Sequence, residues 1–190
     1  PGVLIGRGPN FLMSITSGIL DNVDTFIETI DPKRPTRYLF HGRSRSFERR
    51  VETIHVSGRP DVVQEVLRTV YGPVFFIDRT AGVAFSRQAS FRGRELEAAA
   101  AIVNLGFAHS LKQFDAFTRH VAPSLNLHYA DADGNIAYFH RGARPRRPRN
   151  TDPRLPLDGR GSMEWAGIVP SRQMPSVVNP KRGFITNWNN

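Results

Sequence analysis

Hydrophobic and polar positions alternate along most of the first half of the chain. Thr25 to Ile30 and Val51 to Val56 show the alternation most clearly, and a period of two residues is typical of half-buried strands. Glycine and proline turns separate these segments, and the basic stretch from Arg43 to Arg50 is predicted as a loop. The predicted strands cover residues 11–18, 25–30, 38–40, 51–56, 62–70, 74–77 and 83–86. So many short strands favour a large antiparallel sheet system.

The hydrophobic period changes in the middle of the chain. Residues 94–105 are rich in strong helix formers, carry acidic residues in their first turn, and are followed by Gly106. Ser110 can act as the N-cap of a second helix, which Pro123 ends. The apolar positions of this second helix fall on one stripe: Leu111, Phe114, Phe117 and Val121. We therefore predict two helices near residues 93–122, with the stripe in the core rather than in a cofactor site.

A β-hairpin is predicted next, with Leu125 to Asp131 and Asn135 to His140 as its two strands. The dipeptide Asp133-Gly134 lies between them and is a strong short-range turn signal. The acidic residues of the turn do not form a calcium loop of the EF-hand type, because the third acidic position and the distal glutamate are missing. A tight turn is the better interpretation.

The closing stretch, Gly183 to Asn190, is predicted as a short apolar strand with three asparagines around Trp188. Asparagine is a poor strand former, because its amide competes with the backbone for hydrogen bonds. A strand that ends in asparagines therefore suggests a site that needs neutral donors, although ordinary turn chemistry is the simpler alternative. On an extended strand, Asn187 and Asn189 share one face and Asn190 points to the other.

The charge balance is strongly basic: 26 lysines and arginines against 17 aspartates and glutamates give a net charge of +9. Part of this charge lies in a loop that holds Arg141, Arg144, Arg146, Arg147, Arg149 and Arg154. Such a cluster is compatible with a module that binds nucleic acid or an acidic surface. However, Pro145 and Pro148 interrupt it and no aromatic residue stands between the arginines for base stacking. We expect no nucleic-acid partner.

Several kinds of site have no support in the sequence. There is no cysteine, and hence no disulfide, thiolate metal site or cysteine nucleophile. No apolar run approaches the roughly 20 residues that a membrane helix needs. The six histidines lack the H-E-x-x-H spacing of a zinc site, and no G-x-S-x-G motif marks a serine hydrolase. The residues alone predict a basic, β-rich domain with two helices and no assigned reaction.

A series of short motifs, in a fixed order, carries a family resemblance. The motifs are Asp21-x-Val23-Asp24, Arg68-Thr69-x-Tyr71-Gly72-Pro73-Val74, Tyr129-Ala130-Asp131-x-Asp133-Gly134-Asn135-Ile136, Asp152-Pro153-Arg154-Leu155-Pro156, Trp165-x-Gly167, and Asn179-Pro180 leading to Trp188-Asn189-Asn190. This series resembles the penicillin acylase (penicillin amidase) family of N-terminal nucleophile hydrolases. The resemblance implies an α+β fold, the four-layer αββα sandwich, with this chain as the central part of the β-chain. Tyr71 departs from the family, which usually has histidine there.

The resemblance implies hydrolysis of an N-acyl amide. In this family the α-amino group of an N-terminal serine activates its own hydroxyl, after the precursor has cleaved itself to expose that serine. A backbone N–H and an asparagine side chain hold the negative oxygen of the intermediate, and the matching groups are the N–H of Ser17 and Nδ2 of Asn189. The family more often has alanine at position 17, but serine supplies the same backbone group. β-Lactam side chains, acyl-homoserine lactones and lipopeptides all remain open as substrates.

Two further sets of residues follow from the resemblance. The calcium ligands would be the carboxylates of Asp21 and Asp24 and the carbonyls of Val23 and Pro153, with further ligands from segments outside this sequence. No organic cofactor is expected. The walls of the acyl pocket would include Ile15 and Leu125. The shape of that pocket stays open, because Ile15 replaces a residue that can be small.

The resemblance also implies that this sequence is an excerpt of a longer precursor. We expect the nucleophilic serine before Pro1 and further sequence after Asn190, and we expect the 190-residue chain alone to be inactive. The expected partners are the α-chain and the remaining β-chain segments of the same precursor, in a periplasmic or secreted protein. A catalytically inactive homologue is the alternative, and a serine at a self-cleavage junction upstream would separate the two.

Overall fold

The computed structural model describes residues 4–8 and 10–189. Its chain divides into two compact units, which we describe separately. The first unit comprises Pro1–Asn22, Ser90–Arg146 and Gly167–Asn190, and the second comprises Val23–Ala89 and Arg147–Ala166. Asn190 and Pro1, named in the expectations above, lie outside the described residues.

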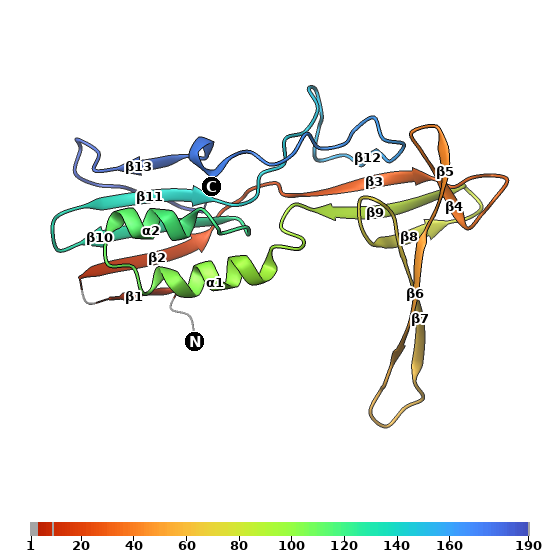
Figure 1. Ribbon diagram of the computed structural model, residues 1–190, viewed down its shortest axis with the longest axis horizontal. Coiled ribbons are helices and arrows are strands. Elements are labelled where there is room, and N and C mark those ends of the chain that lie inside the picture. Colours follow the sequence, from red (N-terminus) through yellow and green to blue (C-terminus); the bar gives the residue numbers. More distant parts are fainter. Residues whose placement is uncertain (1–3, 9, 190) are drawn as a thin grey trace. The chain divides into compact units, whose positions relative to one another are not determined.

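A five-stranded antiparallel sheet forms the first unit (Figure 1). Its strands, in spatial order, are β1 (Ile5–Arg7), β2 (Phe11–Ser17), β10 (Leu125–Asp131), β11 (Ile136–Arg141) and β13 (Ser176–Val178). β10 and β11 are the predicted hairpin, and Gly134 in its turn has a φ of 85°. Positive φ is readily available only to glycine, which explains the turn at this position.

Two helices pack against one face of this sheet. They are α1 (Glu95–Leu105) and α2 (Leu111–Thr118), and the Ser110 side chain caps α2 by accepting a bond from the N–H of Gln113. Phe114 of α2 is fully buried among sheet residues such as Phe11 and Tyr129. The predicted helices and the core role of the stripe are confirmed. α2 ends at Thr118, before Pro123, and Val121 packs in the core beyond its end.

Side chains alternate between the two faces of the sheet along β2 and β10. Met13 of β2 and Leu127 of β10 face the helices and are buried. Thr16 of β2 and Asn126 of β10 are paired across the strands and point to the other face. Hydrogen-bonding side chains thus line the face of the sheet that the helices do not cover.

The second unit is made of strands. A four-stranded sheet has the order β12 (Leu157–Asp158), β3 (Val23–Thr29), β9 (Val83–Ala89) and β8 (Val74–Asp78), with β12 parallel to β3. Two hairpins accompany it, β4 (Arg37–Phe40) with β5 (Arg43–Ser46), and β6 (Glu48–Ile54) with β7 (Val62–Arg68). Phe26 and Tyr71 stack in its core with ring centroids 3.7 Å apart.

The prediction of a loop from Arg43 to Arg50 is wrong. This stretch forms β5 and the start of β6. Most side chains of these strands are exposed, so polar residues are compatible with the ladder; the Arg45 guanidinium, for example, lies 5.8 Å from the Phe40 ring centroid. The short strands β1, β12 and β13 and the 3₁₀ helix η1 (Ser171–Gln173) were not predicted, because so few residues carry no periodicity.

The fold class is α+β and rich in strands, which confirms the prediction. Among the described residues, neither helix is long and apolar enough to span a bilayer.

Candidate active site

The predicted oxyanion-binding serine lies at the end of a central strand. Ser17 is the last residue of β2 and is exposed, opposite Leu125 of β10. Its carbonyl oxygen accepts a hydrogen bond from Nδ2 of Asn126, at 3.0 Å. Gly18 follows, and its N–H donates to the Ser124 carbonyl at 3.1 Å. The backbone around Ser17 is therefore fixed on both sides by the loop and strand that begin the hairpin.

Gly18 is in close contact with its neighbours. A Cβ atom there would lie 2.8 Å from Cε1 of His140 and 2.8 Å from Oγ of Ser124. Observed Cβ atoms essentially never approach other atoms so closely, and neither neighbour is a flexible chain end. Only glycine lets β2 leave the sheet at this point without displacing His140.

Asn126 is completely buried and uses its whole hydrogen-bonding capacity. Its Nδ2 donates to the Ser17 carbonyl at 3.0 Å and to Oδ1 of Asn187 at 3.3 Å. Its Oδ1 accepts from the Tyr138 hydroxyl and from Nδ1 of His140, both at 2.8 Å. A buried amide with four partners avoids the desolvation cost of an unpaired polar group.

Both donors to Asn126 belong to β11 and are held in the neutral form. Burial raises the pKa of the Tyr138 phenol. Burial, and then the positive charges of Arg141 and Arg144, lower the pKa of the His140 imidazole. This part of the site therefore presents uncharged hydrogen-bonding groups near neutral pH.

The closing stretch does not form the predicted strand. The N–H of Gly183 donates to the Pro180 carbonyl in a turn, and residues 184–189 have no ladder partner among the described residues. Asn189 adopts a left-handed conformation with φ of 62°, so the alternation expected of an extended strand does not hold. The side chain of Asn187, rather than a sheet, fixes this segment.

Oδ1 of Asn187 accepts hydrogen bonds from three donors. They are the backbone N–H of Asn189 at 3.1 Å, Oγ1 of Thr16 at 3.3 Å and Nδ2 of Asn126 at 3.3 Å. Asn187 thus connects the segment that carries Asn189 to β2 and β10. We call the connected set the Asn126 network: Thr16, Ser17, Asn126, Tyr138, His140, Asn187 and Asn189.

The structure brings the two predicted oxyanion-binding residues into this one network, although 172 positions separate them in the sequence. Sequence reasoning missed Asn126, Tyr138 and His140. The alternation of β10 and β11 contained a signal, since polar residues at every second position of adjacent strands share a face.

The predicted pocket walls lie near each other. Ile15 pairs with Leu127, and Leu125 pairs with Ser17, so both walls are on neighbouring strands. Both are half-buried and pack against the core under the helices. Their role toward an acyl chain stays a prediction.

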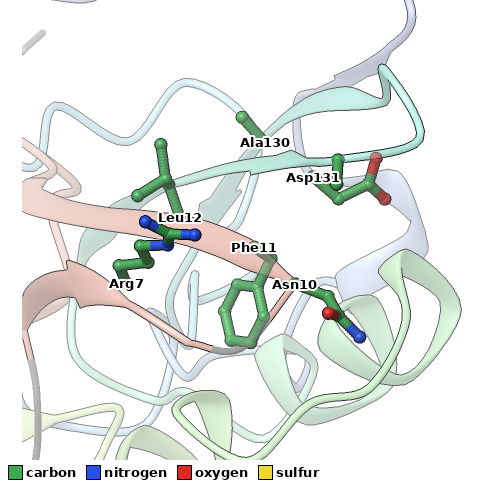
Figure 2. Close-up of a pocket in the computed structure, with 7 residues that line it drawn as sticks. Arg7, Asn10, Phe11, Leu12, Ala130 and Asp131 are labelled. Carbon is green, nitrogen blue, oxygen red and sulfur yellow. The ribbon is translucent and has the colours of Figure 1, made fainter.

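A separate hollow lies at the other end of the same strands. Its volume is about 280 Å³, and it is lined by Arg7, Asn10, Phe11, Leu12, Ala130, Asp131 and Ala132. Figure 2 shows Phe11 directed away from Leu12 and Ala130, as alternation requires. The six steps along β2 from Phe11 to Ser17 span about 20 Å. This hollow is therefore distinct from the Asn126 network.

Asp24, a predicted calcium ligand, has other partners in the second unit. Its side chain is 1% exposed, and Arg147 contacts both carboxylate oxygens, with Nε at 2.8 Å from Oδ2 and Nη2 at 2.9 Å from Oδ1. Nε1 of Trp165 donates to Oδ2 at 2.6 Å. A carboxylate held by a cation and an N–H does not offer free oxygens to calcium, so Asp24 as arranged does not fit that role.

The other predicted ligands leave the question open. Val23 and Pro153 belong to the second unit and Asp21 to the first. No group of three or more acidic or histidine side chains suited to a metal occurs within the part of the chain that the structure describes. Backbone carbonyls are also calcium ligands, so the calcium site stays a prediction.

Half of the arginines in the predicted basic loop have acidic partners in the same unit. Arg141 is buried and donates to Asp115 at 2.8 Å, Arg147 binds Asp24, and Arg154 binds Asp152. These arginines serve the fold, which weakens the alternative of a nucleic-acid-binding module.

Comparison with known proteins identifies the family to which this chain and its fold belong. The penicillin amidase family model matches residues 1–190. The chain is 34% identical over 190 residues to penicillin G acylase of Escherichia coli, covering 100% of the chain and 22% of that protein. It is 28% identical over 198 residues to the acyl-homoserine lactone acylase QuiP of Pseudomonas fluorescens, covering 100% of the chain and 24% of that protein.

A solved structure shows the same fold over the whole chain. The thermostable penicillin G acylase from Alcaligenes faecalis superposes with a TM-score of 0.95 at 37% identity, covering 100% of this chain and 34% of that one. The chain belongs to the penicillin amidase family. It spans about a fifth to a third of the length of these relatives.

Proposed function

We propose that this chain is part of an amidohydrolase that cleaves the amide bond of an N-acyl substrate. Its contribution is the oxyanion hole, formed by the backbone N–H of Ser17 and Nδ2 of Asn189. The observation that carries the proposal is the Asn126 network, which connects the segments of both residues through the hydrogen bonds of a buried asparagine and of Asn187. The substrate class follows from relatives named as acylases of penicillin G and of acyl-homoserine lactones.

The physical role of these groups is differential binding. When a nucleophile attacks the amide carbonyl, its oxygen gains negative charge and shifts as the carbon becomes tetrahedral. Donors fixed at the new oxygen position stabilise the transition state more than the substrate, which raises kcat. Neutral N–H groups suit this role, because a cation would also bind the ground state or lose a proton to the oxyanion. Ile15 and Leu125 would contact the acyl chain.

The other parts of the proposal concern the whole protein. The serine nucleophile and the α-chain would come from the same precursor, and one relative is named as a proenzyme. A periplasmic or secreted location is our expectation for it. Calcium at Asp21, Val23, Asp24 and Pro153 is not part of this proposal, because Arg147 and Trp165 hold the Asp24 carboxylate.

The test is turnover of phenylacetyl and long-chain acyl amides by the full-length protein that contains this chain. Asn189→Ala should lower kcat by about 10²- to 10³-fold, the usual effect of losing one oxyanion-hole donor, while the protein still folds and binds substrate. Asn150→Ala is a matched control, because Asn150 is also exposed with a φ of 62° but lies in the second unit. Near-normal kcat in Asn189→Ala would reject the assignment. A wild type without turnover would favour the inactive homologue.

A further inference from the structure

Asn126 joins the two segments of the proposed oxyanion hole. One amide nitrogen, Nδ2, donates both to the Ser17 carbonyl on β2 and to Oδ1 of Asn187. The same Oδ1 of Asn187 receives the backbone N–H of Asn189. The separation between Ser17 and Asn189 is therefore set in part through this buried side chain, beside the hydrogen bond that Thr16 of β2 donates to Oδ1 of Asn187.

The orientation of this amide is fixed from its other side. Oδ1 of Asn126 accepts from Tyr138 and from His140, and the Ser17 carbonyl, which can only accept, requires Nδ2 on its own side. His140 in turn packs against Gly18, next to Ser17. Asn126 is 0% exposed, so solvent does not reach its own amide atoms.

We propose that Asn126 is a positioning residue, which sets the geometry of the oxyanion hole by holding the Ser17 peptide and Asn187 at a fixed separation. The inference rests on the proposed function. Asn126 acts through its neighbours and contacts no reacting atom. Catalytic groups need support of this kind, because a displacement of about 1 Å can cost on the order of 10²-fold in rate.

The informative variant is Asn126→Asp in the full-length protein. Aspartate is nearly isosteric and still accepts hydrogen bonds from Tyr138 and His140, but it replaces the Nδ2 donor by an oxygen that repels the Ser17 carbonyl and Asn187. We expect kcat to fall by about 10²-fold with little change in KM. Affinity for a tetrahedral phosphonate analogue of the substrate should fall in proportion to kcat/KM, whereas affinity for the product acid should not change.

Asn135→Asp is the matched control for a purely structural effect. Asn135 lies in the turn of the same hairpin, where its side chain donates to Asp131 and accepts from Asn179. This variant should lower the free energy of unfolding. The kcat and KM of the protein that remains folded should both stay unchanged. If both variants lose activity only in proportion to their loss of folded protein, Asn126 has no positioning role.

Tyr138→Phe is the second variant, for the case that Asn126→Asp does not fold or mature. It removes one of the two bonds that orient the amide and leaves both Nδ2 bonds intact. We expect a several-fold lower kcat at unchanged KM. Normal kcat in Tyr138→Phe and in any folded Asn126→Asp, combined with a low kcat in Asn189→Ala, overturns the positioning role and leaves the proposed function standing. Normal kcat in Asn189→Ala overturns both.

Discussion

The two units bury polar side chains in different ways. In the first unit, Asn126 is satisfied by four uncharged hydrogen-bonding groups. In the second, Asp24 is a buried carboxylate that depends on the guanidinium of Arg147 and the indole N–H of Trp165. The neutral arrangement costs little desolvation, whereas the charged one balances a large desolvation cost against a strong pairing.

This difference shows where each arrangement is useful. A net charge inside the Asn126 network would alter the field at the proposed oxyanion position and bind substrate and transition state alike. Neutral donors avoid this, and each contributes about 1 kcal/mol to stability. The buried pair of the second unit has no such restriction and can serve stability alone. Removing a hydrogen-bond partner of Asn126 should therefore lower kcat. Removing the cation that pairs with Asp24 should instead lower the free energy of unfolding.

The largest expected effect on stability comes from Arg147→Ala. It leaves the Asp24 carboxylate buried without its cation, and breaking a buried pair in this way typically costs about 3–5 kcal/mol. Arg154→Ala is the matched control, because the Arg154–Asp152 pair is exposed and such pairs contribute at most about 1 kcal/mol. The measurement is chemical unfolding of the full-length protein. Equal losses in the two variants would show that the Asp24 pair does not stabilise the second unit.

An intermediate effect is expected for Gly18→Ala in the first unit. The added methyl group must displace His140 or Ser124, and inserting atoms into a packed site typically costs about 1–3 kcal/mol. Because His140 donates to Asn126, kcat per folded molecule should also fall, in addition to any loss of folded protein. Gly106→Ala is the matched control in the same unit, because its φ is −68° and an added Cβ would lie 3.6 Å from the nearest atom, the Val103 carbonyl oxygen. A stable, fully active Gly18→Ala variant would contradict the packing argument.

In both the Asn126 network and the Asp24 pair, the sequence predicts one residue of a contact and not its partner. Periodicity predicts α1, α2 and the β10–β11 hairpin, because each of these elements repeats its pattern over several residues. The family motifs lead to Ser17, Asn189 and Asp24. The partners of these residues are not predictable in the same way: Arg147 lies 123 positions from Asp24, and Asn126 lies 109 from Ser17. Such contacts depend on strand register and on turns, and local patterns do not determine these.

A smaller effect, dependent on pH, is expected for Glu28→Gln in the second unit. Glu28 is fully buried, and its Oε1 accepts from the Ser86 hydroxyl at 2.7 Å. Burial raises the pKa of this carboxyl, so the folded state favours its protonated form. Its stabilising contribution is complete below the unfolded pKa and is lost as the pH rises through the folded pKa.

Glutamine resembles the protonated carboxyl and does not ionise. Glu28→Gln should therefore be more stable than wild type by about 1 kcal/mol at pH 7, and the gain should disappear near pH 4. Unfolding free energies measured at both pH values test this. A gain that is the same at pH 4 and pH 7 would mean that Glu28 does not titrate in this range.

The smallest effect is expected from metal removal. With Arg147 on Asp24, a calcium chelator should change the free energy of unfolding of the full-length protein by less than about 1 kcal/mol. A cation bound at 100 times its Kd would instead contribute about 2.7 kcal/mol. A large drop in Tm on chelation would support the calcium prediction and would show that Arg147 moves away from Asp24.

The oxyanion hole itself can be observed directly. The measurement is a crystal structure of the full-length protein bound to a tetrahedral phosphonate analogue of an N-acyl amide. We expect one phosphonate oxygen to lie about 3 Å from the backbone nitrogen of Ser17 and about 3 Å from Nδ2 of Asn189, with the four bonds of Asn126 unchanged. An analogue whose oxygens contact neither group, or contact them only after the bonds of Asn126 have broken, would contradict this account.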